Sequence, residues 1–473
     1  MVIELPADTT SAGLTSANAN SAREAESPIS EPDAEGLIRA ICFKTGPPGA
    51  IGAELEWLVL DSSNPTLIVP FEKIREVLAP LGRPGALPGA GRLTLEPGGQ
   101  VELSTAPATD LSDCVAAASG DLAVLHEAFG EAGLVLTGHG IDPLRRPSRV
   151  LEMPRYAAME EYFDRDGYWG RLMMCSTASV QVCVDAGLED GGTSGYVFRW
   201  RLLHALGPVL VAAFANSPLR RGQPTGWKCT RQLVWSRLDP CRTRPPAGAE
   251  PRSAPGPAGA AGAAANGRAD AREHWVRYAM DADVLCVRHP DGQPWTVPAG
   301  LTFRNWLRSA DRHRAGQPRP PSNTCGPLGT GPTADDLSYH LSTLFPPVRP
   351  RGHLELRMID AQPGEGWIVP VAVVAALADD PAAADAAMAA TEPVWHGRDG
   401  RPWVRAARLG PADPALARAA QRCFEAADAS LARSSAPLPI RRAVAEFADQ
   451  YVRRGRCPAD DILDTIGNRE GQS

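Results

Sequence analysis

The sequence predicts an α+β fold in which an antiparallel sheet exposes one concave, polar face and packs its other face on helices. The strand candidates alternate polar with apolar residues, whereas the strands of a doubly wound parallel sheet would be apolar on both faces. They are also short and are separated by long stretches with the periodicity of helices. With 473 residues, of which 44% are hydrophobic, the chain can bury the large core that this architecture needs.

The first predicted strand, residues 51–60, carries two acids on one face. Because side chains alternate along a strand, Glu54 and Glu56 point one way, and the apolar residues up to Trp57 point the other way. The same alternation recurs in three later segments. Their polar positions are Glu102 in residues 101–103, Gln181 in residues 179–185, and Glu355 with Arg357 in residues 353–358.

A fifth acid, Glu96, precedes the turn that Pro97-Gly-Gly predicts. Isolated carboxylates in a protein interior would be destabilising by about several kcal/mol each, or would protonate. A sheet face this rich in acid therefore indicates bound divalent cations, for which carboxylate oxygens are suitable ligands. On the strand pattern alone, a solvated edge is the alternative for the Glu-x-Glu pair, and a surface ion pair is the alternative for Glu355 and Arg357.

Seven segments have the periodicity of helices. Asp110 is placed to cap the first of them, because its carboxylate can accept hydrogen bonds from the free backbone N–H groups of the first turn. The last two are Ala-rich and hold no acids or histidines arranged for chemistry, so we expect that end to be scaffold. The predicted helices span residues 110–132, 194–214, 270–280, 333–345, 368–393, 413–434 and 438–454.

Three stretches are predicted to be unstructured. Residues 1–33 contain almost no large apolar groups, residues 244–268 form a Pro/Gly/Ala insertion, and the tail after about residue 467 is short and polar. The rest is predicted to form one catalytic domain, residues 34–400, with a helical C-terminal part of the same domain, residues 401–466.

Composition and charge exclude several classes of partner. A net charge of -7 provides no broad basic surface for nucleic acid. No apolar run has the length of a membrane span, and no signal peptide opens the chain, so no membrane association is expected. The ten cysteines are scattered without a CxxC pair, which favours reduced thiols over disulfides or a zinc knuckle. We therefore expect a cytoplasmic protein.

Six segments of the chain, in order, resemble motifs of the glutamate-cysteine ligases of the plant and bacterial type. They lie between about residues 36 and 380, and six motifs in the family's order make the match specific. Within this family, the chain is most similar to the actinobacterial enzymes that make γ-glutamylcysteine for ergothioneine synthesis. The segments are Gly52-Ala-Glu54-Leu-Glu56, Leu95-Glu96-Pro-Gly-Gly-Gln100-Val-Glu102-Leu-Ser104, Met173-Met-Cys-Ser-Thr177-Ala-Ser-Val-Gln181-Val, Phe214-Ala-Asn216-Ser217-Pro, Thr302-Phe-Arg304 and His353-Leu-Glu355-Leu-Arg357.

The resemblance implies a catalytic domain of glutamine-synthetase-like fold that uses ATP and two or three Mg²⁺ ions, for which Mn²⁺ can substitute. ATP would phosphorylate the γ-carboxylate of L-glutamate, and the amine of L-cysteine would displace the phosphate to give γ-glutamylcysteine, ADP and phosphate. Such a reaction needs charge neutralisation and alignment, because a carboxylate must approach a polyanionic triphosphate. The protein would be a monomer or a homodimer.

The resemblance also implies roles for individual residues. Glu355 and Arg357 are the residues expected to act in the chemistry, and Arg357 would face the transferring phosphoryl group, whose oxygens suit its planar fork. The metal positions, some of which meet the glutamate amine, are Glu54, Glu56, Glu96, Glu102 and Glu355.

Nucleotide and substrate contacts are implied in the same way. The positions that the resemblance implies for nucleotide contacts are Gln181, Arg357 and His353. Taken alone, His353 fits a half-buried structural histidine as well as a phosphate contact. The implied substrate contacts are Arg231, Thr177 and Asn216, with Arg231 assigned to the α-carboxylate of glutamate.

Two other functions remain open from the sequence. A ligase of the same superfamily that joins glutamate to a different amine would share the activating half-reaction and its metal site. A catalytically silent binding protein of the same fold would usually have lost metal carboxylates, and all five are present here. A zinc-dependent hydrolase would require clustered His or Cys ligands, which the sequence lacks.

Overall fold

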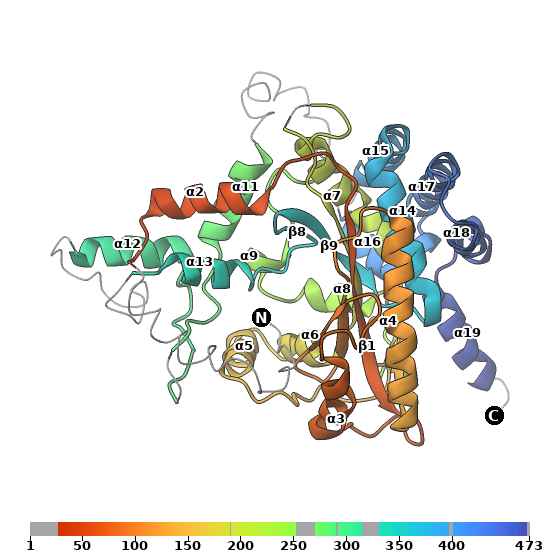
Figure 1. Cartoon of the computed structure of the whole chain (residues 1–473), viewed down its shortest axis with the longest axis horizontal. Coiled ribbons are helices and arrows are strands. Elements are labelled where there is room, and N and C mark those ends of the chain that lie inside the picture. The colour runs from red at the N-terminus through yellow and green to blue at the C-terminus, as the bar shows by residue number, and fades with distance from the viewer. Residues whose placement is uncertain are drawn as a thin grey trace.

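The computed structural model describes residues 27–189, 191–251, 270–289, 292–314, 331–396 and 401–470. Its centre is a twisted antiparallel sheet with helices on both sides (Figure 1). The strand order is β2 (Arg92–Leu95), β3 (Val101–Ser104), β1 (Ile51–Asp61), β5 (Ser179–Asp185), β9 (His353–Asp360) and β8 (Val348–Pro350), with β4 (Leu134–Thr137) also paired to β1. The α+β class and the antiparallel sheet predicted from the sequence are confirmed.

One face of the sheet packs on helices through the apolar positions of its strands. Ala53, Leu55 and Trp57 of β1 are all buried, as the two-residue repeat predicts. The helices on this face are α4 (Leu111–Glu131), α7 (Tyr196–Ala213) and α14 (Ile368–Asp379), which contact β1, β9 and β5 respectively. Helix α14 is buried from Ile368 to Ala378, because the C-terminal helices cover its far side (Figure 1).

The polar face of the sheet is bordered by shorter helices on the opposite side (Figure 1). These are α5 (Pro154–Asp164), α6 (Trp169–Ser176) and α8 (Thr230–Trp235). Helix α6 packs on both α5 and α8, so the three form one wall that stands over the sheet. The space between this wall and the polar face holds the candidate site.

The remaining helices form two groups. A projecting arm contains α2 (Glu31–Cys42), α11 (Ala271–Asp281), α12 (Phe303–Arg314) and α13 (Ala334–Leu341), with α9 (Pro240–Thr243) at its base (Figure 1). The C-terminal layer contains α15 (Pro381–Trp395), α16 (Pro402–Leu409), α17 (Pro414–Arg433), α18 (Leu438–Gln450) and α19 (Pro458–Glu470). Outside these groups lie α3 (Phe71–Leu81), the hairpin of β6 (Leu219–Arg220) and β7 (Gln223–Pro224), and the 3₁₀ turns Gly364–Trp367, Gly410–Ala412 and Val452–Arg454.

Each of the seven predicted helices is present. Asp110 caps α4 by accepting a hydrogen bond from the backbone N–H of Asp113 at 2.9 Å. The segment predicted as one helix over 368–393 is two helices, α14 and α15, because the chain breaks at Asp380 and Pro381 begins the second. Helices α2, α3, α5, α6, α8, α9, α12, α16 and α19 were not predicted.

Two predicted boundaries are corrected. Helix α2 begins at Glu31, inside the stretch expected to be unstructured, because Ser30 and Asp33 form a capping box that the composition of the segment hid. Helix α19 continues through residue 467 to Glu470, where a polar tail was expected. Residues 1–26 and 252–269, which include most of the two predicted unstructured stretches, lie outside the described residues.

Within the described residues, no single helix is long and apolar enough to cross a membrane. Only the pair Gly364–Asp379 and Pro381–Trp395 passes that test of length and composition together, and this pair is bent by 104° at its break.

Candidate active site

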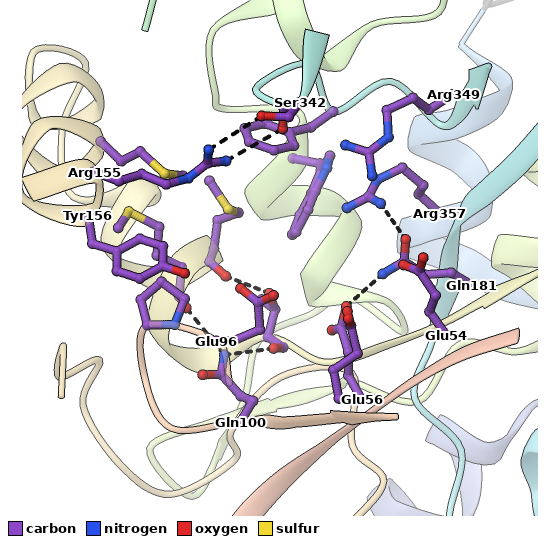
Figure 2. A pocket seen from close by; sticks show the side chains of 18 of the residues that line it. Glu54, Glu56, Glu96, Gln100, Arg155, Tyr156, Gln181, Ser342, Arg349 and Arg357 are labelled. Atoms are coloured by element: carbon purple, nitrogen blue, oxygen red, sulfur yellow. Dashed lines mark hydrogen bonds between the residues drawn. The ribbon is translucent and has the colours of Figure 1, made fainter. Parts of the chain in front are cut away.

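Four acids line a cavity of about 540 Å³ above the polar face of the sheet. Three come from strands and are aligned by register: Glu56 of β1 lies opposite Glu102 of β3, and Glu54 lies opposite Gln181 of β5. The fourth, Glu96, follows β2. Figure 2 shows Glu54, Glu56, Glu96 and Gln181 pointing into the same space. Four of the five acids that the sequence singled out therefore line one cavity. The fifth, Glu355, is fully buried and is not among the lining residues.

The turn Pro97-Gly98-Gly99 delivers Glu96 to this cavity. A side chain at Gly98 would put its Cβ 2.3 Å from the carbonyl oxygen of Cys175, so the turn can approach α6 only with glycine there. Gly99 has a φ of +85°, which favours glycine as well. The turn is closed by the N–H of Gly99, which donates to the carbonyl of Glu96 at 2.8 Å. Both glycines are thus explained by geometry.

The acids repel one another in a buried site. Burial raises the pKa of Glu54, and the carboxylates of Glu355 and Glu102 raise it further. Burial and Glu102 likewise raise the pKa of Glu56. Burial and the carboxylates of Glu102 and Glu56 raise the pKa of Glu96 to about 8. When ionised, this group of acids would carry more negative charge than the surrounding described residues neutralise.

Glu355 has the opposite environment. In the hairpin of β8 and β9 it lies directly opposite Arg349, whose Nε and Nη2 donate to its carboxylate at 2.6 and 3.0 Å. Arg357, two residues further along β9, donates to it at 3.1 Å. Burial opposes ionisation, but Arg349 and Arg357 outweigh it and hold the pKa of Glu355 well below its ordinary value. Glu355 is therefore a neutralised carboxylate.

Gln181 connects the two groups of charges. Its amide donates to Glu56 at 2.8 Å, and its oxygen accepts a hydrogen bond from Arg357. The pairing of β5 with β9 is irregular between Val180 and Val182, and a bulge of this kind changes the direction of a side chain. Gln181 thus reaches both an acid and an arginine across two strands.

Arg231 enters the cavity from α8. It is 2% exposed, and its Nη2 donates to the carbonyl of Arg357 at 2.7 Å, while Nε and Nη1 have no partner among the described residues. Its Cζ lies 4.5 Å from the centre of the Trp235 ring. A buried guanidinium with two free donors is suited to bind an anion.

The helical wall of the cavity was not predicted from the sequence. It contributes Arg155 and Tyr156 of α5, and Figure 2 shows Tyr156 pointing toward Glu96. Methionines make up most of the rest of this wall, and Gln100 supports it by donating to the carbonyl of Thr177 at 2.9 Å. No periodic signal marks these residues, but Arg349 could have been found by pairing residues 348–350 with the strand that begins at His353.

Not every residue assigned from the resemblance lies in the cavity. Thr177 lines it, with its hydroxyl donating to the carbonyl of Met173 at 2.7 Å. Asn216 does not: its amide donates to the carbonyls of Gly138 at 2.7 Å and Ala361 at 2.8 Å, in the scaffold behind the sheet. His353 shares the face of Glu355 but lies outside the residues that line the cavity.

The donor set of the cavity fits a hard divalent cation. Glu54, Glu56, Glu96 and Glu102 offer only oxygen ligands, which Mg²⁺ prefers, and the raised pKa values of the first three report uncompensated negative charge. As they stand, no three His, Cys, Asp or Glu side chains in the described part of the chain are close enough together to form a metal site. The residues fit the ion in chemistry and charge.

Comparisons with known proteins agree with the motifs. The model of the glutamate-cysteine ligase family 2 matches residues 50–473. The glutamate–cysteine ligase EgtA of Mycobacterium tuberculosis is 39% identical over 431 residues, which cover 90% of this chain and 88% of that protein. The EgtA of Mycolicibacterium smegmatis is 39% identical over 91% of this chain and 90% of its own length. A crystal structure of a glutamate–cysteine ligase from Francisella tularensis with AMP is 11% identical, covers 89% of this chain and 85% of its own, and has a TM-score of 0.42.

Proposed function

The chain belongs to the glutamate-cysteine ligase family 2 and is a glutamate–cysteine ligase, and we propose that the cavity above the sheet is where it activates and couples its substrates. The family is one of ATP-dependent ligases. The observation that carries the proposal is the arrangement of uncompensated acids beside an arginine-rich region in one cavity. This is the charge pattern that a triphosphate and its cations require.

The proposed reaction has two steps. First, an oxygen of the glutamate γ-carboxylate attacks the γ-phosphorus of ATP, which forms γ-glutamyl phosphate and breaks the bond to ADP. Second, the cysteine amine attacks the γ-carbonyl carbon, phosphate leaves, and the nitrogen loses a proton to give the amide. In the first step Arg357 contacts the transferring phosphoryl group, and Gln181 supports it from the nucleotide side.

Glu54, Glu56, Glu96, Glu102 and Glu355 are the proposed ligands of two or three Mg²⁺ ions, which Mn²⁺ can replace. When bound, these ions neutralise phosphate charge and bring two anions together. Of these acids, the chain itself already neutralises Glu355, through Arg349 and Arg357. We therefore assign the stronger cation requirement to the other four acids.

The donor amino acid is proposed to bind through Arg231. Its free Nε and Nη1 suit the α-carboxylate of glutamate, and Thr177 lines the same cavity. Holding the α-carboxylate at one point fixes how far the reacting carboxylate reaches. Aspartate, which is one methylene shorter, would place its carboxylate more than about an ångström away from the phosphoryl group, and misplacement on this scale can lower the rate about 10²-fold.

The setting of the reaction follows from the same resemblance. We propose that γ-glutamylcysteine made here serves ergothioneine synthesis and that the protein acts in the cytoplasm. The nine described cysteines are all free, which is the state expected in a reducing compartment. His353 is proposed to contribute on the nucleotide side from just outside the cavity, as a neutral imidazole, because burial lowers its pKa.

A coupled assay of ADP release tests the function. With ATP, Mg²⁺, L-glutamate and L-cysteine, we expect ADP and γ-glutamylcysteine in equal amounts, with the product identified by mass spectrometry. Aspartate should replace glutamate poorly, and 2-aminobutyrate should replace cysteine slowly, because apolar contacts discriminate between small side chains by only about 1–3 kcal/mol. If cysteine gives no more product than ammonia or unrelated amines, a broader glutamate–amine ligase replaces this proposal.

A further inference from the structure

Arg155 lines the cavity without an acidic partner among the described residues. It is 5% exposed, and its guanidinium makes two long hydrogen bonds to Ser342, of 3.4 Å to the hydroxyl and 3.5 Å to the carbonyl. Its Cζ also lies 5.1 Å from the centre of the Tyr339 ring. A buried cation with neutral partners is destabilising unless a ligand supplies negative charge.

The other arginines of the cavity have different positions. Arg349 and Arg357 are bound to Glu355, and Arg351 lies 3.9 Å from the same carboxylate. Arg92 also lines the cavity, but it is exposed at the start of β2. Arg155 extends into the cavity from the side opposite Arg349 (Figure 2). The ligation joins two amino acids, each with an α-carboxylate. Arg231 is proposed to bind the α-carboxylate of glutamate, so the α-carboxylate of cysteine still needs a partner.

Four methionines line the same cavity as Arg155. Met153 directly precedes α5, Met159 lies within α5, and Met173 and Met174 belong to α6. We call these four residues the methionine wall. Thioether side chains are apolar, polarisable and adaptable, and they offer a phosphate neither charge nor a hydrogen-bond donor. The methionine wall therefore suits the small side chain of an amino acid rather than the phosphates of a nucleotide.

We propose that Arg155 and the methionine wall form the acceptor subsite, in which Arg155 binds the α-carboxylate of cysteine and the methionines contact its thiol-bearing side chain. This inference rests on the proposed function of the cavity. A guanidinium can grip a carboxylate through two parallel N–H donors, which fixes orientation as well as position. Since the acceptor's amine and carboxylate share one carbon, holding the carboxylate also directs the amine.

The proposed subsite predicts which acceptors the enzyme uses. The carboxylate is selected by charge, whereas the side chain is selected only by apolar fit. An acceptor without the carboxylate, such as cysteamine, should be used poorly, although it keeps both the amine and the thiol of cysteine. Loss of a charge-assisted contact lowers binding by about 10- to 100-fold.

The experiment compares L-cysteine with cysteamine as acceptor for the wild type and for Arg155→Gln, at saturating ATP, Mg²⁺ and glutamate. We expect the wild type to prefer cysteine in kcat/KM by about 10- to 100-fold. In Arg155→Gln, kcat/KM for cysteine should fall by about that factor while kcat/KM for cysteamine stays within about threefold. The preference should therefore nearly disappear, and the KM values for glutamate and ATP should change little.

Arg288→Gln is a matched control. The Cζ of Arg288 lies 4.5 Å from the same Tyr339 ring, but this arginine pairs with Asp335 and does not line the cavity. Its loss should leave the preference for cysteine unchanged. Arg155→Lys is the second variant if Arg155→Gln does not fold, because it keeps the charge without the planar fork and should show a preference between the two extremes.

Three results would overturn the subsite. Equal losses with cysteine and cysteamine in the Arg155 variants would mean that Arg155 only supports the fold. A rise in KM for glutamate, with the preference for cysteine intact, would place Arg155 on the donor instead. Failure of the wild type to form γ-glutamylcysteine would overturn the proposed function itself, and the acceptor subsite with it.

Discussion

Buried carboxylates that line the cavity and the buried Glu355 beside it have opposite electrostatic environments. At the β8–β9 hairpin, Glu355 accepts hydrogen bonds from Arg349 and Arg357, and its pKa is held low. Above β1 and β2, Glu54 and Glu96 face other acids, and their pKa values are raised. Glu355 already has its counter-charges, whereas the acids of the second region are the ones for which we propose bound cations.

The difference indicates that the two regions have different roles in the reaction. An arginine–carboxylate network holds its shape before any ligand arrives, so it can present donors to a phosphoryl group in a fixed geometry. A group of mutually repelling acids, by contrast, favours whatever binds as a cation. Each prediction below tests whether the two regions really differ in this way.

The largest effect is expected on turnover when the acids of the cation region are neutralised. Glu54→Gln and Glu102→Gln should each lower ADP release by orders of magnitude while the circular dichroism spectrum stays unchanged, because each removes a proposed metal ligand. Glu127→Gln, on the exposed side of α4, is the control and should be active. Wild-type rates in both cavity variants would show that these acids are ordinary polar residues of the sheet.

Substitutions in the two regions should have opposite effects on the free energy of unfolding. Glu355→Gln leaves Arg349 and Arg357 without their shared counter-charge, and breaking a buried pair in this way is destabilising by about 3–5 kcal/mol. Glu54→Gln relieves repulsion instead, so without metal it should be as stable as the wild type or more so. Denaturant unfolding in the presence of a chelator measures both. Equal losses of unfolding free energy would remove the distinction between the regions.

The arginine region should act on the chemical step more than on nucleotide binding. Arg357→Lys replaces a planar fork by a point charge, so we expect kcat to fall about 10²- to 10³-fold, while KM for ATP changes little. The control is Arg288→Lys, at a residue that pairs with Asp335 and does not line the cavity, and it should leave kcat unchanged. A change confined to KM for ATP would make Arg357 a ground-state contact of the nucleotide.

The smallest effect concerns the pH dependence of cation binding. The pKa of Glu96 is raised to about 8, so at neutral pH without metal this carboxyl is largely protonated in the folded protein. A cation must displace that proton, and its affinity should therefore rise with pH by up to about tenfold per unit for each proton released, until about pH 8. Calorimetric titrations with Mg²⁺ or Mn²⁺ in buffers of different ionisation heat count the protons. An affinity that is constant from pH 6 to 8 would contradict this account.

The fold was predictable where the signal is local. Period-two alternation identified β1, β3, β5 and β9 and assigned Glu54 and Glu56 to the polar face, because neighbouring side chains on a strand point to opposite sides whatever surrounds them. Long helices with caps, such as α4, were found because helical periodicity and capping residues are also local signals. The short helices α5 and α6 were missed, although their side chains make up one wall of the cavity.

The residues found only in the structure share one property. Arg155 and the methionine wall reach the cavity because α5 and α6 fold over the sheet, and no pattern within residues 153–174 reveals that they do. Asn216 shows the converse. It belongs to a motif of the family, yet its amide is bound to two backbone carbonyls outside the cavity. A motif identifies a family without saying which of its side chains face a ligand.

The sequence by itself determined the class of fold, the acidic polar face and the family, because strand alternation and ordered motifs are properties of residues near one another in the chain. The tertiary structure alone decided which acids are neutralised. Glu355 and Glu54 look alike in their strands, but the hairpin register sets Arg349 opposite the first. The second lies opposite the neutral Gln181 and near two other acids, Glu355 and Glu102. Charge compensation depends on distances between segments far apart in sequence, and only folding sets those distances.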